Sequence, residues 1–364
     1  MKKLLIFHPT IAPYRIDFFN DLYKAFETRV CLMFRNLKTQ KFDYDKIAAQ
    51  FAFDPIYQNS NKGHSRKFYW KHLDDFNPDV VLVEEFNIGA FYVLMHRFLK
   101  RKKYRIITIC DDSYDMVTKN NGFSRAHRYA RKVVTPRIDG MILVEPKVTE
   151  WYKQNYKKGI YFPIIKSDEK ARENYQRLLP ISQEAVNKYN LIGKRIILFV
   201  GRLINIKNVD SAIRAFSRLD QKENAFVIIG DGPERENLMA LSKDLGTNAI
   251  FTGRLEGDEL NAWYNVAQVF ILPSYLEPFG AVTNEALLAG CKGLISNQAG
   301  SRCLIEEGVN GYTFSPKDID DIEQKMRKAF SEILPLEDVI LKKNNMQKSY
   351  DELIENVIDY IDNI

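Results

Sequence analysis

The sequence predicts an α/β protein with two doubly wound domains, each built on a parallel sheet. Short, almost entirely apolar runs alternate with helical patterns, and this alternation occurs twice along the 364 residues. Apolar residues make up 45% of the chain, which is enough for well-packed cores in two domains of ordinary size. Nearly all-apolar strands that alternate with helices are typical of parallel sheets covered on both faces.

In the first half of the chain, five apolar runs predict strands and two periodic segments predict helices. The first run is followed by His8 and Pro9, and it therefore predicts a first strand rather than a signal peptide. The expected strands are residues 4–7, 30–34, 80–83, 105–109 and 140–144, and the expected helices are residues 16–26 and 89–100.

The second half repeats this pattern after a polar stretch. Strands are expected at residues 196–200, 225–229, 249–251, 269–272 and 293–295, and helices at 209–218, 233–243, 258–266 and 281–289. Residues 163–192 contain two prolines and no clear strand, so a hinge is expected at 188–194. The predicted domains are therefore residues 1–190 and 191–345. The last segment, residues 349–364, has apolar residues at helical spacing and predicts an amphipathic helix.

The charge is distributed unevenly. The net charge is +6, but residues 1–190 contain 34 Lys and Arg against 21 Asp and Glu, whereas the remainder contains 19 against 26. Basic residues gather at 97–105 and 125–132. A basic helix at 94–103 fits either a solvated face or contact with an anionic membrane surface. No nucleic-acid-binding motif accompanies the charge, so we expect no nucleic-acid partner.

Cysteines and histidines argue against disulfides and metal. Four cysteines occur without a C-x-x-C pair, which fits a reduced cytoplasmic setting. The basic first half leaves association with the inner face of the membrane open. The sequence contains no run of 18 apolar residues, so no transmembrane helix is predicted. The five histidines lack zinc-ligand spacing. Asp43 and Asp45 form a D-x-D triplet, but no strand precedes it, so we expect no metal and no cofactor.

The segment from Ser274 to Gly290 is the most informative in the chain. It places Glu277 and Glu285 eight residues apart, across a loop between an apolar strand and a helix. The N–H groups of residues 279–282 would lie at the carboxyl end of the strand, where anionic ligands bind in α/β sheets. A phosphate bound to these N–H groups, with a carboxylate on each side that accepts hydrogen bonds from sugar hydroxyls, is the arrangement expected of a nucleotide-sugar site.

This segment resembles the E-x7-E element of retaining glycosyltransferases of the GT-B fold, family 4, which carry a glycosyltransferase group 1 type C-terminal domain. Further segments resemble other elements of that family and keep its order from about residue 195 to 330. They are Ile-Ile-Leu-Phe-Val-Gly-Arg-Leu at 196–203 with Lys207-Asn208, Gly-Asp-Gly-Pro-Glu at 230–234, Phe-Thr-Gly at 251–253 and Asn-Gly-Tyr-Thr-Phe at 310–314. The first 190 residues resemble the family more loosely.

The resemblance implies two Rossmann-like domains whose parallel sheets face each other across a cleft. The first domain would present the acceptor, and the second would hold the nucleotide-diphosphate sugar. The C-terminal helix, at about residues 346–364, would pack back on the first domain. The implied activity is metal-independent, configuration-retaining transfer of a sugar to a glycan or lipid-linked acceptor, in cell-surface polysaccharide synthesis.

The resemblance also suggests roles for individual residues. Arg202 and Lys207 would stabilise the leaving diphosphate, Glu277 would position the transferred sugar, and Asp112 would lie on the far side of that sugar. The expected donor-binding residues are Gly201, Arg254, Phe279, Gly280, Ala281, Val282 and Glu285. Tyr14 and Arg15, in the first loop, are expected on the acceptor side.

Two features of the first half depart from the family pattern. The first loop lacks the usual glycine-rich turn, and Asp111 and Asp112 stand where many members have a histidine. The sequence leaves open which of these two carboxylates faces the site. These departures keep other functions open, namely a retaining phosphorylase or nucleotide-sugar epimerase on the same fold, or a non-catalytic sugar-nucleotide-binding protein.

Overall fold

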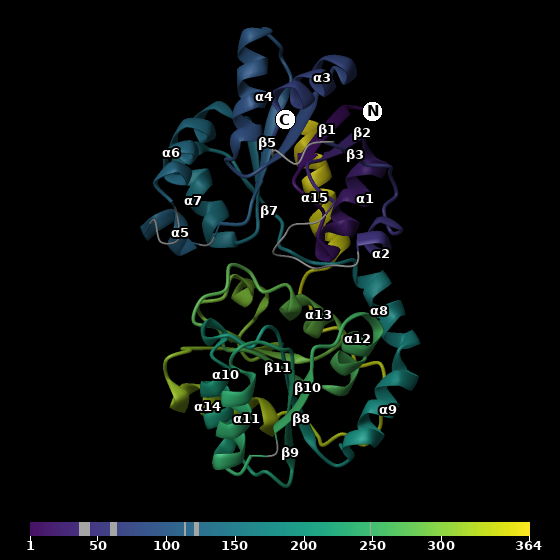
Figure 1. Ribbon diagram of the computed structural model, residues 1–364, viewed down its shortest axis with the longest axis vertical. Coiled ribbons are helices and arrows are strands. Elements are labelled where there is room, and N and C mark those ends of the chain that lie inside the picture. Colours follow the sequence, from purple (N-terminus) through teal and green to yellow (C-terminus); the bar gives the residue numbers. More distant parts are fainter. Residues whose placement is uncertain (36–43, 59–63, 113, 120–123, 248) are drawn as a thin grey trace. The chain divides into compact units, whose positions relative to one another are not determined.

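The computed structural model describes residues 1–35, 44–58, 64–112, 114–119, 124–247 and 249–364. The chain forms two compact units (Figure 1). Unit 1 comprises Met1–Lys166 and Tyr350–Ile364, and unit 2 comprises Ser167–Ser349. Among the helices of these described ranges, none combines the length and the apolar character needed to cross a membrane.

Unit 1 is built on a seven-stranded parallel sheet with the order β3-β2-β1-β4-β5-β6-β7. The strand order reverses between β1 and β4, which pair directly. The carboxyl ends of these two strands therefore form the topological switch point, where open α/β sheets bind ligands. The strands are β1 (Lys3–His8), β2 (Glu27–Leu32), β3 (Ile56–Tyr57), β4 (Val80–Glu84), β5 (Arg105–Cys110), β6 (Gly140–Leu143) and β7 (Ile160–Tyr161).

The helices of unit 1 cover this sheet and include the last helix of the chain. Figure 1 shows α15, in yellow, beside α1, in purple. The Tyr350 hydroxyl donates to Asp21 Oδ2 at 2.9 Å. The helices are α1 (Ile16–Ala25), α2 (Tyr44–Ala48), α3 (Arg66–Phe76), α4 (Ile88–Leu99), α5 (Tyr114–Lys119), α6 (Arg125–Val134), α7 (Pro146–Tyr156) and α15 (Tyr350–Asn363).

Unit 2 is built on a six-stranded parallel sheet with the order β10-β9-β8-β11-β12-β13. Numbered within the unit, this is the 3-2-1-4-5-6 order of the dinucleotide-binding Rossmann fold. The switch point lies between β8 and β11, which pair directly. The strands are β8 (Arg195–Val200), β9 (Asn224–Ile229), β10 (Ala249–Gly253), β11 (Val269–Leu272), β12 (Lys292–Ser296) and β13 (Gly311–Phe314).

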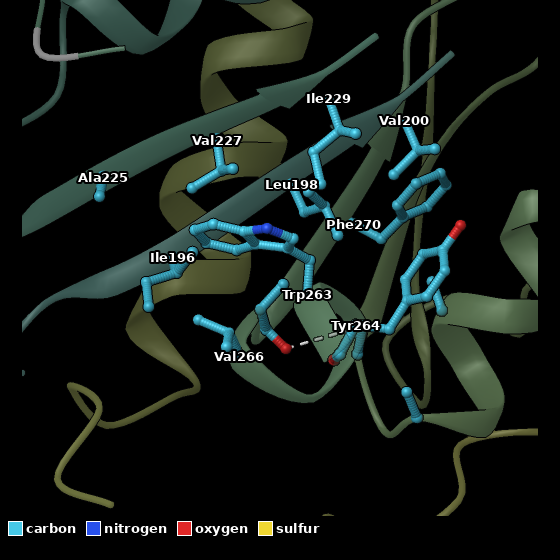
Figure 2. Packing of buried hydrophobic residues seen from close by; sticks show 14 of the residues in the cluster. Ile196, Leu198, Val200, Ala225, Val227, Ile229, Trp263, Tyr264, Val266 and Phe270 are labelled. Atoms are coloured by element: carbon cyan, nitrogen blue, oxygen red, sulfur yellow. Dashed lines mark hydrogen bonds between the residues drawn. The ribbon is translucent and has the colours of Figure 1, made fainter. Parts of the chain in front are cut away.

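Helices cover both faces of the unit 2 sheet. Alternate residues of β8 and β9 point to one face and pack against Trp263 and Tyr264 (Figure 2). The intervening residues pack on the other face, against α10 and α14. Burial on both faces explains why these strands are apolar throughout. The helices are α8 (Asp168–Arg177), α9 (Leu179–Tyr189), α10 (Val209–Ser217), α11 (Arg235–Asp244), α12 (Gly257–Val266), α13 (Val282–Leu288) and α14 (Ile319–Ser331).

All ten predicted strands are present, and the prediction of two Rossmann-like parallel-sheet domains is confirmed. The polar stretch at residues 163–192, at whose end a hinge was expected, forms α8 and α9. These helices pack on unit 2, partly through Tyr175 and Val186 in its core. The division between the units consequently falls after Lys166 rather than near residue 190.

Candidate functional site

The loops after β8 and β11 meet at the switch point of unit 2. The N–H of Tyr275, after β11, donates to the carbonyl of Ile206, after β8, at 2.9 Å. Close by, the ammonium of Lys207 is ion-paired with Oε2 of Glu277. The two side chains are only 17% and 14% exposed, so solvent screens this pair less than it would a surface pair. The structure thus brings together two of the predicted catalytic residues.

The turn from Glu277 into α13 is held by its carbonyl groups. The carbonyls of Glu277 and Phe279 accept from the N–H groups of Gly300 and Ser301, at 3.0 and 2.7 Å. Gly280 adopts a left-handed conformation with φ +93°. The N–H groups of residues 279–282 donate to no acceptor among the described residues. Four unpaired amides therefore lie next to the Lys207–Glu277 pair, as the predicted phosphate contact requires.

Glu285 is fixed by two buried tyrosines. The Tyr264 hydroxyl donates to Glu285 Oε2 at 2.9 Å, and the Tyr175 hydroxyl donates to the Glu285 carbonyl at the same distance. Burial, and then the Glu285 charge, raises the pKa of both tyrosines well above the usual value, so both remain protonated donors. The sequence analysis identified Glu285 but missed both supports, because α8 was not predicted and Tyr264 fits a purely apolar role.

Gly201 and Arg202 lie at the start of the loop after β8, which also carries Lys207. Gly230, at φ +151°, approaches so closely that a Cβ there would lie 1.8 Å from the Gly201 carbonyl oxygen. Glycine is thus required by the packing of the two loops. The Arg202 side chain is exposed and contacts no hydrogen-bond or ion-pair partner within the part of the chain that the structure describes. It is a cation available to a ligand at this edge.

Arg254 lies further away within unit 2. It follows β10, which is two strands from β8 in the sheet. Its exposed guanidinium is ion-paired with the Glu256 carboxylate, with Nε 2.7 Å from Oε1. The structure therefore does not bring Arg254 to the switch point, and its contact with the donor remains a prediction.

The residues expected on the acceptor side lie at the switch point of unit 1. Tyr14 and Arg15 lie in a 3-10 turn, Pro13–Arg15, after β1. The buried Arg15 donates from Nη2 to Oδ1 of Asp111, after β5, at 2.6 Å. Its Nη1 is buried and has no hydrogen-bond partner within the described residues. His8, at the end of β1, is also buried, and burial followed by the Arg15 charge lowers its pKa to about 3.

The structure distinguishes the two neighbouring aspartates. The Asp111 side chain is 40% exposed, whereas Asp112 is 2% exposed and lies 3.5 Å from the Tyr152 hydroxyl. Burial raises the pKa of Asp112. Asp111 is thus the carboxylate at the surface of this edge. A direct contact between Asp112 and a sugar remains a prediction, which its burial disfavours.

Glu84 and Glu85 were missed by the sequence analysis. Glu84 is the last residue of β4, opposite β1, and Glu85 follows it. The Glu84 carboxylate lies 3.6 Å from Nε2 of His8. Burial, and then the charge of Glu85, raises the pKa of Glu84 to about 8. Burial, and then the charge of Asp112, raises the pKa of Glu85 to about 7. The acidic pair follows an apolar run, a signal that could have identified it at a strand end facing a ligand.

The raised pKa values of Glu84 and Glu85 lie near neutral pH, so each carboxyl is partly protonated there. A protonated carboxyl can both donate and accept hydrogen bonds. These two carboxyl groups do not form a metal site, since no set of three or more His, Cys, Asp or Glu residues in the described ranges is arranged to hold a metal ion. Asp43 of the D-x-D triplet lies outside the described residues. Metal independence therefore remains a prediction.

Comparison with solved structures identifies the class of fold. Over the whole of both chains, the structure is similar to Anabaena HepE crystallised with UDP, with a TM-score of 0.76 at 13% sequence identity. It is also similar to the lipopolysaccharide outer core galactosyltransferase WaaB, with a TM-score of 0.69 at 18% identity over 99% of this chain and 98% of that chain. The chain therefore has the two-domain fold of GT-B glycosyltransferases.

Sequence comparison identifies the domain in the second half. Residues 182–348 match the family described as Glycosyl transferases group 1, so this domain is present. An uncharacterised glycosyltransferase of Methanocaldococcus jannaschii, MJ1607, is 37% identical over 147 residues, which cover 38% of each chain. The sulfoquinovosyl transferase SQD2 of Arabidopsis thaliana is 35% identical over 37% of this chain and 26% of its own. The chain thus spans less than two fifths of the length of these two relatives.

Proposed function

We propose that the protein is a glycosyltransferase that moves a sugar from a nucleotide-diphosphate sugar to a glycan or lipid-linked acceptor. The observation that carries this proposal is the Lys207–Glu277 ion pair beside four unpaired amides, at the switch point of unit 2. The Glycosyl transferases group 1 match covers the same segment. Enzymes that synthesise lipopolysaccharide and complexes with UDP among proteins of similar fold support the same substrate class.

In this proposal the diphosphate binds to the amides of residues 279–282 and to the Arg202 guanidinium. Amides and cations fixed before the reaction stabilise the charge that develops on the leaving diphosphate. The Lys207 ammonium has a second task, because its contact with Glu277 fixes that carboxylate. Glu277 then accepts hydrogen bonds from the transferred sugar, and Glu285, fixed by Tyr264, accepts from the ribose.

The transfer breaks the bond between the anomeric carbon and the diphosphate oxygen. It forms a bond between that carbon and an acceptor oxygen, and the acceptor proton passes to the leaving diphosphate. Both bonds lie on the same face of the sugar, so the configuration is retained. No metal ion takes part, because Arg202 and Lys207 supply the positive charge. Tyr14, Arg15 and Asp111 contact the acceptor from unit 1.

A product assay tests this proposal. The protein is incubated with nucleotide-diphosphate sugars and a detergent extract of glycolipids, with and without a chelator, and the release of nucleoside diphosphate is measured. We expect acceptor-dependent release that survives chelation, and a product of unchanged anomeric configuration by NMR. A requirement for inorganic phosphate, or conversion of the donor sugar without an acceptor, would instead indicate a phosphorylase or an epimerase.

A further inference from the structure

Helices α4 and α6 of unit 1 lie side by side (Figure 1). Both helices expose large apolar side chains. Phe98 is 82% exposed and Tyr129 is 72% exposed, and Leu99 is also exposed. Between the helices lies a groove of about 500 Å³, and Ile88, Phe91 and Tyr129 are among the residues that line it. An apolar surface of this kind, on two neighbouring helices, is typical of an interaction site rather than of scattered surface residues.

The exposed apolar residues Ile88, Phe91 and Phe98 lie along one stripe of α4. They are spaced by three and seven residues, and positions at this spacing share a face. The stripe begins at the groove and continues to the carboxyl end of α4. Tyr129 of α6 lines the same groove. The two helices together therefore form a single apolar surface.

Cations flank this surface without nearby acidic residues in the sequence. Residues 88–105 and 125–134 contain ten Lys and Arg residues and no Asp or Glu. Some of these cations form ion pairs within the fold, such as Arg97 with the Asp139 carboxylate. Four others, Lys100, Lys103, Arg125 and Lys132, are exposed and form no ion pair with the described part of the chain. The charge complements an anionic partner.

We infer that the surface formed by α4 and α6 docks on an anionic lipid bilayer, with Phe98, Leu99 and Tyr129 inserted among the headgroups. The combination of exposed aromatic and aliphatic side chains with surrounding cations favours a membrane over a nucleic acid or an acidic protein. Transfer of apolar side chains from water to the membrane interface has a favourable free energy, and the cations are attracted to anionic headgroups. The sequence indicated the two basic clusters, whereas the groove between α4 and α6 and the exposed apolar side chains around it come from the structure.

Vesicle sedimentation with the full chain tests this inference without requiring turnover, so its result is independent of the proposed glycosyl transfer. We expect binding to vesicles of phosphatidylcholine with 30% phosphatidylglycerol in roughly 50 mM salt, and weaker binding in roughly 300 mM salt, where the screening length is shorter. Binding to pure phosphatidylcholine is expected to be much weaker.

Two sets of variants separate the apolar and the charged contributions. Replacement of Phe98, Leu99 and Tyr129 by serine, or of Lys100, Lys103, Arg125 and Lys132 by glutamine, should each weaken partitioning by at least about tenfold. The matched controls lie in unit 2, where Leu334 is exposed to a similar degree and Lys243 and Lys317 are exposed cations. Leu334→Ser, and the pair Lys243→Gln with Lys317→Gln, should bind like the original protein. Circular dichroism checks that each variant is folded.

Three outcomes would overturn the inference. The first is no binding to anionic vesicles at low salt. The second is equal loss of binding in the unit 2 controls. The third is retained vesicle binding in a folded serine variant that has also kept its affinity for a polyanion such as heparin, because the surface would then act through charge alone.

Discussion

The ammonium of Lys207 is ion-paired with the carboxylate of Glu277, across the switch point of the unit 2 sheet. The two residues are 70 positions apart in the sequence and belong to loops that follow different strands. A cation held next to unpaired amides is suited to a diphosphate. A carboxylate oriented by that cation is suited to the sugar hydroxyls. The pair therefore links the diphosphate and sugar contacts of the proposed donor site.

Arg202→Ala tests the charge stabilisation alone. The Arg202 side chain contacts no partner in the described part of the protein, so its loss should leave the melting temperature unchanged. Transfer should fall by about 10²–10³-fold in kcat, the usual effect of removing one group that stabilises developing charge. Kinetics and a thermal melt of the same preparation check both expectations. Unchanged turnover in both Arg202→Ala and Lys207→Ala would contradict the proposed mechanism.

Lys207→Ala should cost both activity and stability. The Glu277 carboxylate, whose side chain is only 14% exposed, would lose its partner, and the free energy of unfolding should fall by about 1–3 kcal/mol. Glu277→Gln in the Lys207→Ala background removes the uncompensated charge, so stability should recover while transfer remains absent. Chemical denaturation of the single and double variants measures the coupling. Additive losses of stability would show that the ion pair does not fix Glu277.

Tyr264→Phe tests how Glu285 is held. The substitution keeps the ring in the core and removes the hydroxyl that donates to Glu285 at 2.9 Å. A hydrogen bond to a charged group contributes about 1.5–3 kcal/mol, so the Kd of the nucleotide should rise by about tenfold or more. A 2′,3′-dideoxy nucleotide, which lacks the ribose hydroxyls, should bind the variant and the original protein equally.

Tyr175→Phe is the matched control for this measurement. Within the described ranges the Tyr175 hydroxyl donates to the backbone carbonyl of Glu285 and not to its carboxylate, which remains fixed by Tyr264. The nucleotide Kd should therefore change less than in Tyr264→Phe. If Tyr264→Phe weakens the dideoxy nucleotide as strongly as the natural one, Glu285 does not hold the ribose.

Glu84→Gln should change how the stability of the protein depends on pH. The folded-state pKa of Glu84, about 8, lies above the ordinary value of 4.5, so the folded protein binds the proton more tightly than the unfolded chain. This contribution to stability is fully present below pH 4.5 and is lost as the pH rises through about 8.

Glu84→Gln should therefore match the original protein at pH 5 and exceed its stability at pH 8.5. Because 31% of the Glu84 side chain is exposed, solvent screening limits the expected gain to about 1–2 kcal/mol. Urea denaturation at the two pH values measures it. Glu355→Gln, an exposed position on α15, serves as the control. An equal effect of Glu84→Gln at both pH values would show that the pKa of Glu84 is not raised.

Lys342→Met should destabilise unit 2. The Lys342 ammonium donates to the carbonyls of Tyr264, Asn265 and Ala267, at and beyond the end of α12, and burial lowers its pKa. Methionine retains most of the packing volume and leaves these acceptors without a donor, which should cost about 2–4 kcal/mol. Lys343→Met, at the exposed neighbouring position, should be nearly neutral in the same denaturation experiment.

The sequence predicted the elements whose signal is local and continuous. Apolar runs such as 196–200 identify strands because both faces of β8 are buried. The two-residue strands β3 and β7 escaped because their pairing depends on neighbouring strands. The helices α8 and α9 escaped because their sequences are largely polar and only Tyr175, Val186 and a few others reach the core. Their packing moved the division between the units.

The candidate donor site was predicted more completely than the unit 1 edge. Glu277, Glu285 and residues 279–282 belong to one short segment whose spacing could be interpreted directly. The partners that fix them, Lys207 and Tyr264, come from other strands and helices, so only the fold reveals these contacts. At the unit 1 edge, the apolar run before Glu84 and Glu85 could have indicated a strand end, but the contact of Glu84 with His8 depends on the pairing of β4 with β1 and is visible only in the fold.

Binding of nucleoside diphosphates tests the central claim most directly. A thermal-shift panel of UDP, GDP and ADP at one common concentration should show one nucleotide that stabilises the protein more than the others. Where that concentration is about 100 times the Kd of this nucleotide, the gain should be about 2.7 kcal/mol, or roughly 5–10 °C. Arg202→Ala and Lys207→Ala should each reduce this shift strongly, because the diphosphate would lose a cation. A panel without any stabilising nucleotide, or a shift that both variants retain in full, would contradict a diphosphate site at the switch point of unit 2.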